Sequence, residues 1–137
     1  MGTYDKDGIR FEYPETWTLD EDNGDSRAIA VHSPGGAFWL VSPTADEDPD
    51  WVADEALRAL EEEYENLESE PVAESVAGHD LVGYDVNFWY LDLTNTSLIR
   101  SVRTAGATLL VLCQSEDREF ADVADVFRAM TASLLAG

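Results

Sequence analysis

Lysine is nearly absent from this chain of 137 residues, which contains Lys6 and no other lysine. Its 8 basic residues face 29 aspartates and glutamates, so the net charge is −21. A polyanion is repelled by nucleic acids and by anionic membranes, and we expect neither as a partner. An acidic, lysine-poor composition is typical of proteins from salt-rich cells, which predicts a salt-adapted protein. The alternative is a charge that serves only solubility.

Cysteine and histidine are also scarce, with Cys113, His32 and His79 the only examples. One cysteine excludes an internal disulfide. The three residues fall short of the four ligands of a structural zinc site. Cys113 follows the apolar segment 109–112 and has no histidine at a spacing known for nucleophilic catalysis, so we expect a buried structural thiol. No catalytic motif, phosphate loop or dinucleotide fingerprint is present, and we expect a non-enzyme with no catalytic residue, metal site or cofactor.

Long apolar segments are missing as well. The longest runs, such as Leu109 to Cys113, are far shorter than the ~20 residues of a transmembrane helix. The first seven residues lack the apolar segment of a signal peptide. We therefore expect a soluble, cytoplasmic protein. The length, together with a hydrophobic content of 45%, fits one domain over residues 1–137.

Hydrophobic periodicity predicts an α+β fold. Apolar residues alternate over seven segments that we interpret as strands, namely 8–13, 27–32, 37–41, 72–76, 82–90, 98–104 and 108–114. Helical spacing predicts one helix from Asp48-Pro49 to Pro71 and a second over about 117–134. Turns are predicted at 20–25 and 94–96. Because the strand connections are short, we expect a mainly antiparallel sheet of about six or seven strands, with the two main helices packed on its faces.

Both ends of the chain carry a familiar pattern. The segment Ile9-Arg10-Phe11-Glu12-Tyr13-Pro14-Glu15-Thr16-Trp17 resembles the opening of the PsbP/Mog-like superfamily, and Phe127-Arg128-Ala129-Met130-Thr131-Ala132-Ser133-Leu134 resembles its closing helix. The resemblance covers nearly the whole chain and implies an α/β/α sandwich. It also implies protein binding, since the superfamily includes a photosystem II subunit, the Ran-binding Mog proteins and Eag-type chaperones. No functional residue of these proteins can be matched onto this sequence.

Four residues form the predicted partner-binding face. Side chains alternate between the two faces of a strand, so Trp89 lies opposite Phe88 and Tyr90, which we expect in the core, and on one face with Asp85 and Asn87. The same alternation separates Trp39 from Phe38. Tryptophans beside polar residues suit a binding surface. In the alternative interpretation, a helix covers this face and both tryptophans are core.

Charged residues allow two further predictions. Between Thr44 and Glu74, thirteen acidic residues accompany only Arg58, so this segment carries −12 of the total charge. It is either a docking face for a basic partner or the solvated side of a helix in a salt-adapted protein. Arg100 and Arg103 should point to opposite faces of a strand, each pairing with a carboxylate such as Asp85.

These observations favour a non-enzymatic adaptor or chaperone-like domain. Its expected partner is another protein or a second copy of itself in a homodimer. The alternative is a small-molecule or metal-binding accessory protein, for which a closed apolar pocket with one convergent polar group would be evidence.

The charge of −21 predicts that salt stabilises the fold. Added salt shortens the Debye length from about 10 Å at 0.1 M to about 3 Å at 1 M, which relieves repulsion between the acidic groups. We therefore expect the melting temperature to rise when KCl is increased to molar concentration, as measured by circular dichroism. A flat or falling melting temperature would contradict salt adaptation.

Overall fold

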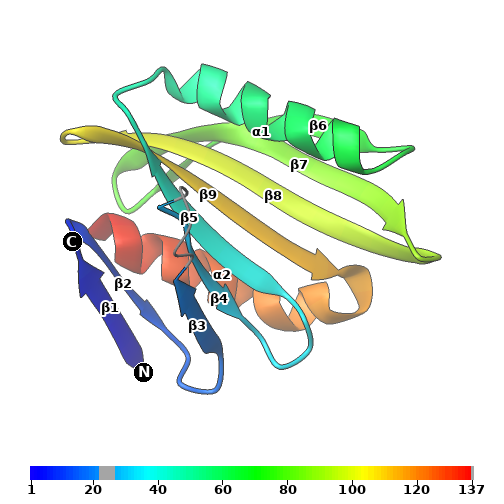
Figure 1. Ribbon diagram of the computed structural model, residues 1–137, viewed down its shortest axis with the longest axis horizontal. Helices are drawn as coiled ribbons and strands as arrows, with labels where there is room; N and C mark the ends of the chain where they lie inside the picture. Colours follow the sequence, from blue (N-terminus) through cyan, green and yellow to red (C-terminus); the bar gives the residue numbers. More distant parts are fainter. Residues whose placement is uncertain (22–26, 137) are drawn as a thin grey trace.

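The computed structural model describes residues 1–21 and 27–136. Seven strands form one antiparallel sheet in the order β3-β4-β5-β9-β8-β7-β6, and β1 pairs with β2 in a separate hairpin (Figure 1). In chain order the elements are β1 (Gly2–Lys6), β2 (Ile9–Tyr13), β3 (Thr18–Glu21), β4 (Ile29–His32), β5 (Phe38–Thr44), α1 (Pro49–Glu63), β6 (Glu68–Val76), β7 (His79–Tyr90), β8 (Leu93–Thr104), β9 (Ala107–Glu116) and α2 (Asp117–Ala136).

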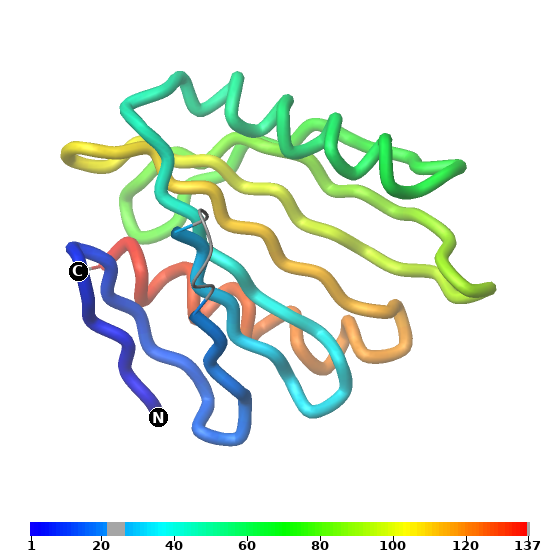
Figure 2. The backbone as a smooth tube through the Cα atoms, viewed as in Figure 1, coloured from blue at the N-terminus to red at the C-terminus, as the bar shows by residue number. Residues whose placement is uncertain are grey.

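The two helices lie on opposite sides of the sheet, and the β1–β2 hairpin lies beside α2 (Figure 2). Between α1 and the sheet is a small core that contains Ala53, Leu60, Val86, Phe88 and Ile99. A larger core on the α2 side includes Phe11, Trp39, Val111, Phe127 and Met130. The predicted α+β class and α/β/α sandwich are therefore confirmed.

The first helix is shorter than its periodicity predicts. It begins after the N-cap Asp48, whose side chain accepts a hydrogen bond from the amide of Asp50, as the Asp-Pro signal indicates. It ends at Glu63, because Tyr64 adopts an extended conformation, with φ −121° and ψ 135°. Pro71, the predicted stop, lies instead within β6, an edge strand, where a missing backbone N–H is tolerated.

Two short strands, β1 and β3, were not predicted, because neither shows a clear alternation of apolar residues. The predicted turn at 94–96 is wrong, since these residues belong to β8 and the hairpin turns at 91–92. Most of the predicted turn at 20–25 lies outside the described residues.

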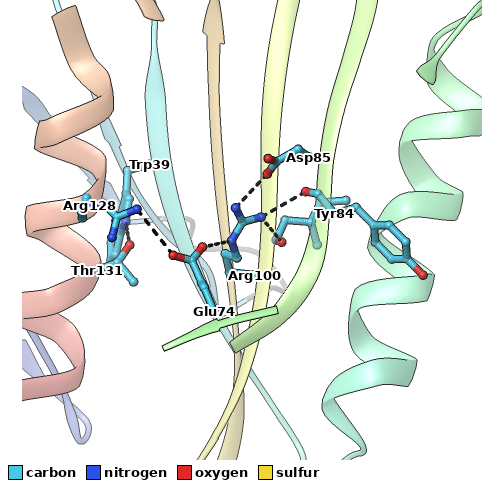
Figure 3. Close-up of polar contacts among 8 residues, drawn as sticks. Trp39, Glu74, Tyr84, Asp85, Arg100, Arg128 and Thr131 are labelled. Atoms are coloured by element: carbon cyan, nitrogen blue, oxygen red, sulfur yellow. Dashed lines mark hydrogen bonds and ion pairs between the residues drawn. The ribbon is translucent and has the colours of Figure 1, made fainter. Parts of the chain in front are cut away.

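Trp39 is core, which corrects the predicted partner-binding face. Its side chain is 0% exposed and its ring centroid lies 4.7 Å from that of Phe11 on β2. The indole N–H donates a hydrogen bond of 3.0 Å to Oγ1 of Thr131 on α2 (Figure 3). A partner cannot reach this residue, because α2 covers the part of the sheet face on which it lies.

Replacing Trp39 with alanine should therefore destabilise the fold. Loss of a buried tryptophan costs about 3–5 kcal/mol through lost packing and the resulting cavity. The measurement is the free energy of unfolding from urea denaturation, with Trp51→Ala as the control because Trp51 is 52% exposed. We expect the control to change stability by less than about 0.5 kcal/mol. Equal stability of the two variants would show that Trp39 is not core.

Candidate partner-binding surface

The β7–β8 hairpin is too long for the helices to cover. Each strand has 12 residues, which corresponds to about 40 Å of extended chain. The 15 residues of α1 span only about 22 Å. The end of the hairpin projects beyond β9 (Figure 1). Residues 89–93, which we call the hairpin tip, are therefore left without a covering layer.

The hairpin tip exposes large apolar side chains. Trp89 is 60% exposed, Tyr90 53%, Leu91 76% and Leu93 37%. By register, Tyr90 pairs with Leu93 and both lie on the α1 side of the sheet, whereas Trp89 lies on the α2 side. Within the described residues, the only other exposed large apolar side chains are the separate Met1 and Trp51. The tip thus concentrates exposed apolar side chains in one place.

Leu91 has an unfavourable backbone conformation. Tyr90 and Leu93 are paired, so Leu91 and Asp92 alone form the turn, with φ values of 53° and 64°. Turns with two positive φ values favour Asn-Gly, and a leucine in this left-handed region costs about 1–2 kcal/mol. Because Leu91 is also largely exposed, the fold gains no packing that offsets this cost. Such strained positions cluster at functional sites.

The structure places Asp85, Asn87 and Trp89 on one face of β7, and it engages the first two in internal hydrogen bonds. Asn87 Nδ2 donates to Thr96 Oγ1 at 3.0 Å, and Thr96 Oγ1 donates to Asp117 Oδ1 at 2.7 Å. This chain of hydrogen bonds joins β7 and β8 to the first residue of α2. Asp85 and Asn87 therefore support the base of the tip, while Trp89 remains accessible.

Arg100 holds the middle of the hairpin in place. Its side chain is 11% exposed, its Nε pairs with Glu74, and its Nη2 donates to Asp85 at 2.8 Å (Figure 3). Nη1 donates to the carbonyls of Ile99 at 2.9 Å and Tyr84 at 3.3 Å. Burial lowers the pKa of Arg100, but the hydrogen bonds to the two carboxylates outweigh it and raise the pKa above its usual value. The predicted cross-strand pair is confirmed, and it is a structural ion cluster.

Gly83 makes close strand approach at this cluster possible. It pairs with Arg100 in the register, and a Cβ atom at this position would lie 1.7 Å from the carbonyl oxygen of Ile99. No side chain fits there without moving β8 away from β7. Arg103 points to the opposite side, as predicted, where its Nη1 lies 2.6 Å from Asp46.

The acidic end of α1 borders the hairpin tip. Tyr64 follows the last residue of α1, and its ring stacks on Phe88 at 4.1 Å and lies edge-on to Tyr90 at 5.6 Å. The exposed glutamates next to it in the chain are Glu61, Glu62, Glu63 and Glu65. The last turn of α1 has no basic residue, so its carboxylates oppose the helix dipole.

The thiol and the grooves offer little chemistry. Cys113 is buried, as predicted, and burial raises the pKa of its thiol far above the usual range. It lines a groove of about 370 Å³ between α2 and the sheet, in which Glu74, Asp85, Arg100 and Arg128 form ion pairs with one another and Asp125 is a further charged lining residue. Over residues 1–21 and 27–136, no three His, Cys, Asp or Glu side chains gather in a metal-binding arrangement. Neither described helix combines the length and hydrophobicity of a membrane span.

Sequence reasoning missed the apolar turn. It assigned Tyr90 to the core, although this side chain is half exposed, and it did not single out Leu91 or Leu93. The available signal was the apolar run from Phe88 to Leu91, which continues to the end of a strand without a glycine. Because this turn contains neither glycine nor asparagine, the sequence does not indicate where the chain reverses direction.

The sequence matches no protein-family model and no curated protein. Its structure is similar to that of the PsbP protein CyanoP from Synechocystis sp. PCC 6803, with a TM-score of 0.72 and 13% identity over 96% of this chain and 89% of that one. It is also similar to LpqN of Mycobacterium tuberculosis, involved in cell envelope biogenesis, with a TM-score of 0.64 and 15% identity over 89% and 79% of the two chains. A third similar structure is PA94 from Pseudomonas aeruginosa, a protein of unknown function, with a TM-score of 0.59 and 14% identity over 98% and 95%.

These likenesses show a shared fold. The fold that the resemblance implies is confirmed, since the fold of CyanoP matches almost the whole length of this chain. None of the three proteins is named for a catalytic activity. Function must be argued from the site itself, because one fold hosts many functions.

Proposed function

We propose that this chain, which has the PsbP-like fold, is a non-enzymatic adaptor or chaperone-like domain that binds another protein through its hairpin tip. The observation that carries the proposal is the exposure of Trp89, Tyr90, Leu91 and Leu93 on one projecting turn. Burying one such side chain contributes about 1.5–3 kcal/mol. Tryptophan and tyrosine are also enriched among the residues that dominate binding energy at interfaces.

The base of the tip supports the same function, because hydrogen bonds and ion pairs hold it to the rest of the fold. Arg100 fixes the middle of the hairpin, and the hydrogen bonds of Asn87 and Thr96 tie its outer part to α2. A surface that is ordered before binding loses less conformational entropy when a partner arrives. The backbone that carries the exposed side chains is therefore anchored before a partner binds.

The chain's acidity belongs to the same proposal. We place the protein in the cytoplasm of a salt-rich cell, where screening relieves the repulsion between its acidic groups. A standard interface buries about 800 Å² on each partner, which is more than four side chains supply. The partner must therefore also contact the surface around the tip.

The experiment begins by trapping the partner at the tip. A photo-crosslinking phenylalanine derivative replaces Tyr90 in the full chain, and replaces Trp51 in a control chain. Both residues are aromatic and about half exposed, at 53% and 52%. A protein that is crosslinked through position 90 and not through position 51 is then purified, and its affinity for the unmodified chain is measured.

Leu91→Asn is the decisive variant, because it should change stability and binding in opposite directions. Asparagine tolerates a positive φ better than leucine, so we expect the free energy of unfolding to rise by up to about 1 kcal/mol. Removing the leucine should raise the dissociation constant of the complex at least tenfold, which corresponds to a loss of about 1.4 kcal/mol of binding free energy. Trp51→Ala should leave the affinity unchanged. A destabilised Leu91→Asn variant, or one that binds as tightly as the unmodified chain, would contradict the proposal.

A further inference from the structure

We propose that the partner segment is basic as well as apolar, an inference that rests on the proposed function. Its apolar side chains pack on Tyr90, Leu91 and Leu93, and its lysines or arginines face the glutamates at the end of α1. The segment would lie on the α1 side of the hairpin, where the apolar and the acidic surfaces meet.

Tyr64 brings these two surfaces together. Its ring lies 5.6 Å from that of Tyr90, which shares the α1 side of the hairpin with Leu93. It directly follows Glu61, Glu62 and Glu63 in the chain. A segment seated on Tyr90 and Leu93 would therefore run beside these carboxylates.

The glutamates at the end of α1 have no ion-pair partner among the described residues. Over the part of the chain that the structure describes, Glu61, Glu62, Glu63 and Glu65 form no ion pair, although other acidic residues do. Near the other end of α1, by contrast, Asp46 pairs with Arg103 and Asp48 caps the helix. Cations of a partner would relieve the repulsion between these carboxylates and their conflict with the helix dipole.

Charge also disfavours the other occupants of an apolar tip. A second copy of the chain would bring its own glutamates to the same place, and like charges that face each other across an interface are costly. An anionic membrane would be repelled by the same residues. A basic protein segment is the occupant that satisfies both the apolar and the acidic surface.

Synthetic peptides test this chemistry directly. The probe is a capped twelve-residue peptide of alternating leucine and lysine, titrated into the full chain and followed by nuclear magnetic resonance. The comparison peptides replace every lysine with glutamate, or every leucine with serine. We expect the leucine–lysine peptide to bind at least tenfold more tightly than either, and more weakly in 1 M KCl. It should shift the amides of residues 61–65 and 90–93, which lie beside the α1 side of the tip, but not the Trp51 indole.

Two triple variants separate local charge from total charge. Glu61→Gln/Glu62→Gln/Glu63→Gln removes three charges beside the tip, whereas Asp80→Asn/Asp122→Asn/Asp125→Asn removes three from other exposed positions. We expect the first variant to bind the leucine–lysine peptide at least fivefold more weakly than the unmodified chain does. The second variant should lose less than twofold in affinity. Equal losses of affinity in the two variants would mean that the peptide is attracted unspecifically to a polyanion, and would overturn the inference. Failure of the leucine–lysine peptide to bind the unmodified chain would also overturn it.

The remaining outcomes distinguish this inference from the proposed function. If the leucine–glutamate peptide binds the tip equally well, the tip still binds proteins and only the basic partner is wrong. If Leu91→Asn changes no protein binding, the proposed function itself fails. Leu91-dependent cosedimentation with phosphatidylcholine vesicles would make the occupant a membrane. A Leu91-dependent dimer in sedimentation equilibrium would make it a second copy. Either result overturns the inference.

Discussion

The length of the β7–β8 hairpin is the constraint on which this structure depends. Strands of 12 residues extend about 40 Å, whereas helices of 15 and 20 residues extend about 22 and 30 Å. Each helix covers one part of one face, and neither reaches the turn. A solvent-exposed turn is usually polar, but this one carries Trp89, Tyr90, Leu91 and Leu93. The composition of the tip is therefore explained by function better than by folding.

The remaining polar interactions stabilise the hairpin from its base outward. Gly83 lets β7 and β8 approach closely, and Arg100 joins β6, β7 and β8 through Glu74 and Asp85. Farther out, Thr96 connects the pair to α2, and Tyr64 connects the other face to the end of α1. Partly buried ion clusters of this kind often contribute little net stability. This one places Arg100 within reach of both carboxylates only in the observed strand register.

Strand alternation predicted which face each side chain occupies, but not which part of that face is covered. Trp39 and Trp89 lie on the same side of the sheet, yet Trp39 is 0% exposed beneath α2 and Trp89 is 60% exposed. Periodicity is local, whereas the position of α2 over the sheet depends on packing between distant segments. The reversal at Leu91 was unpredictable for a related reason, since neither it nor Asp92 is a residue that favours such turns. Local patterns alone predicted the fold class. They also predicted the cross-strand ion pair of Arg100 and the buried thiol of Cys113.

The central claim is that the tip is accessible in solution. The most direct measurement adds a neutral, soluble paramagnetic compound and records the broadening of the indole N–H resonances of the four tryptophans. Our account predicts strong broadening for Trp89, which is 60% exposed, and for Trp51, which is 52% exposed. Trp17 and Trp39, at 9% and 0%, should remain sharp. A Trp89 resonance as protected as that of Trp39 would show that the tip is covered, and would contradict the account.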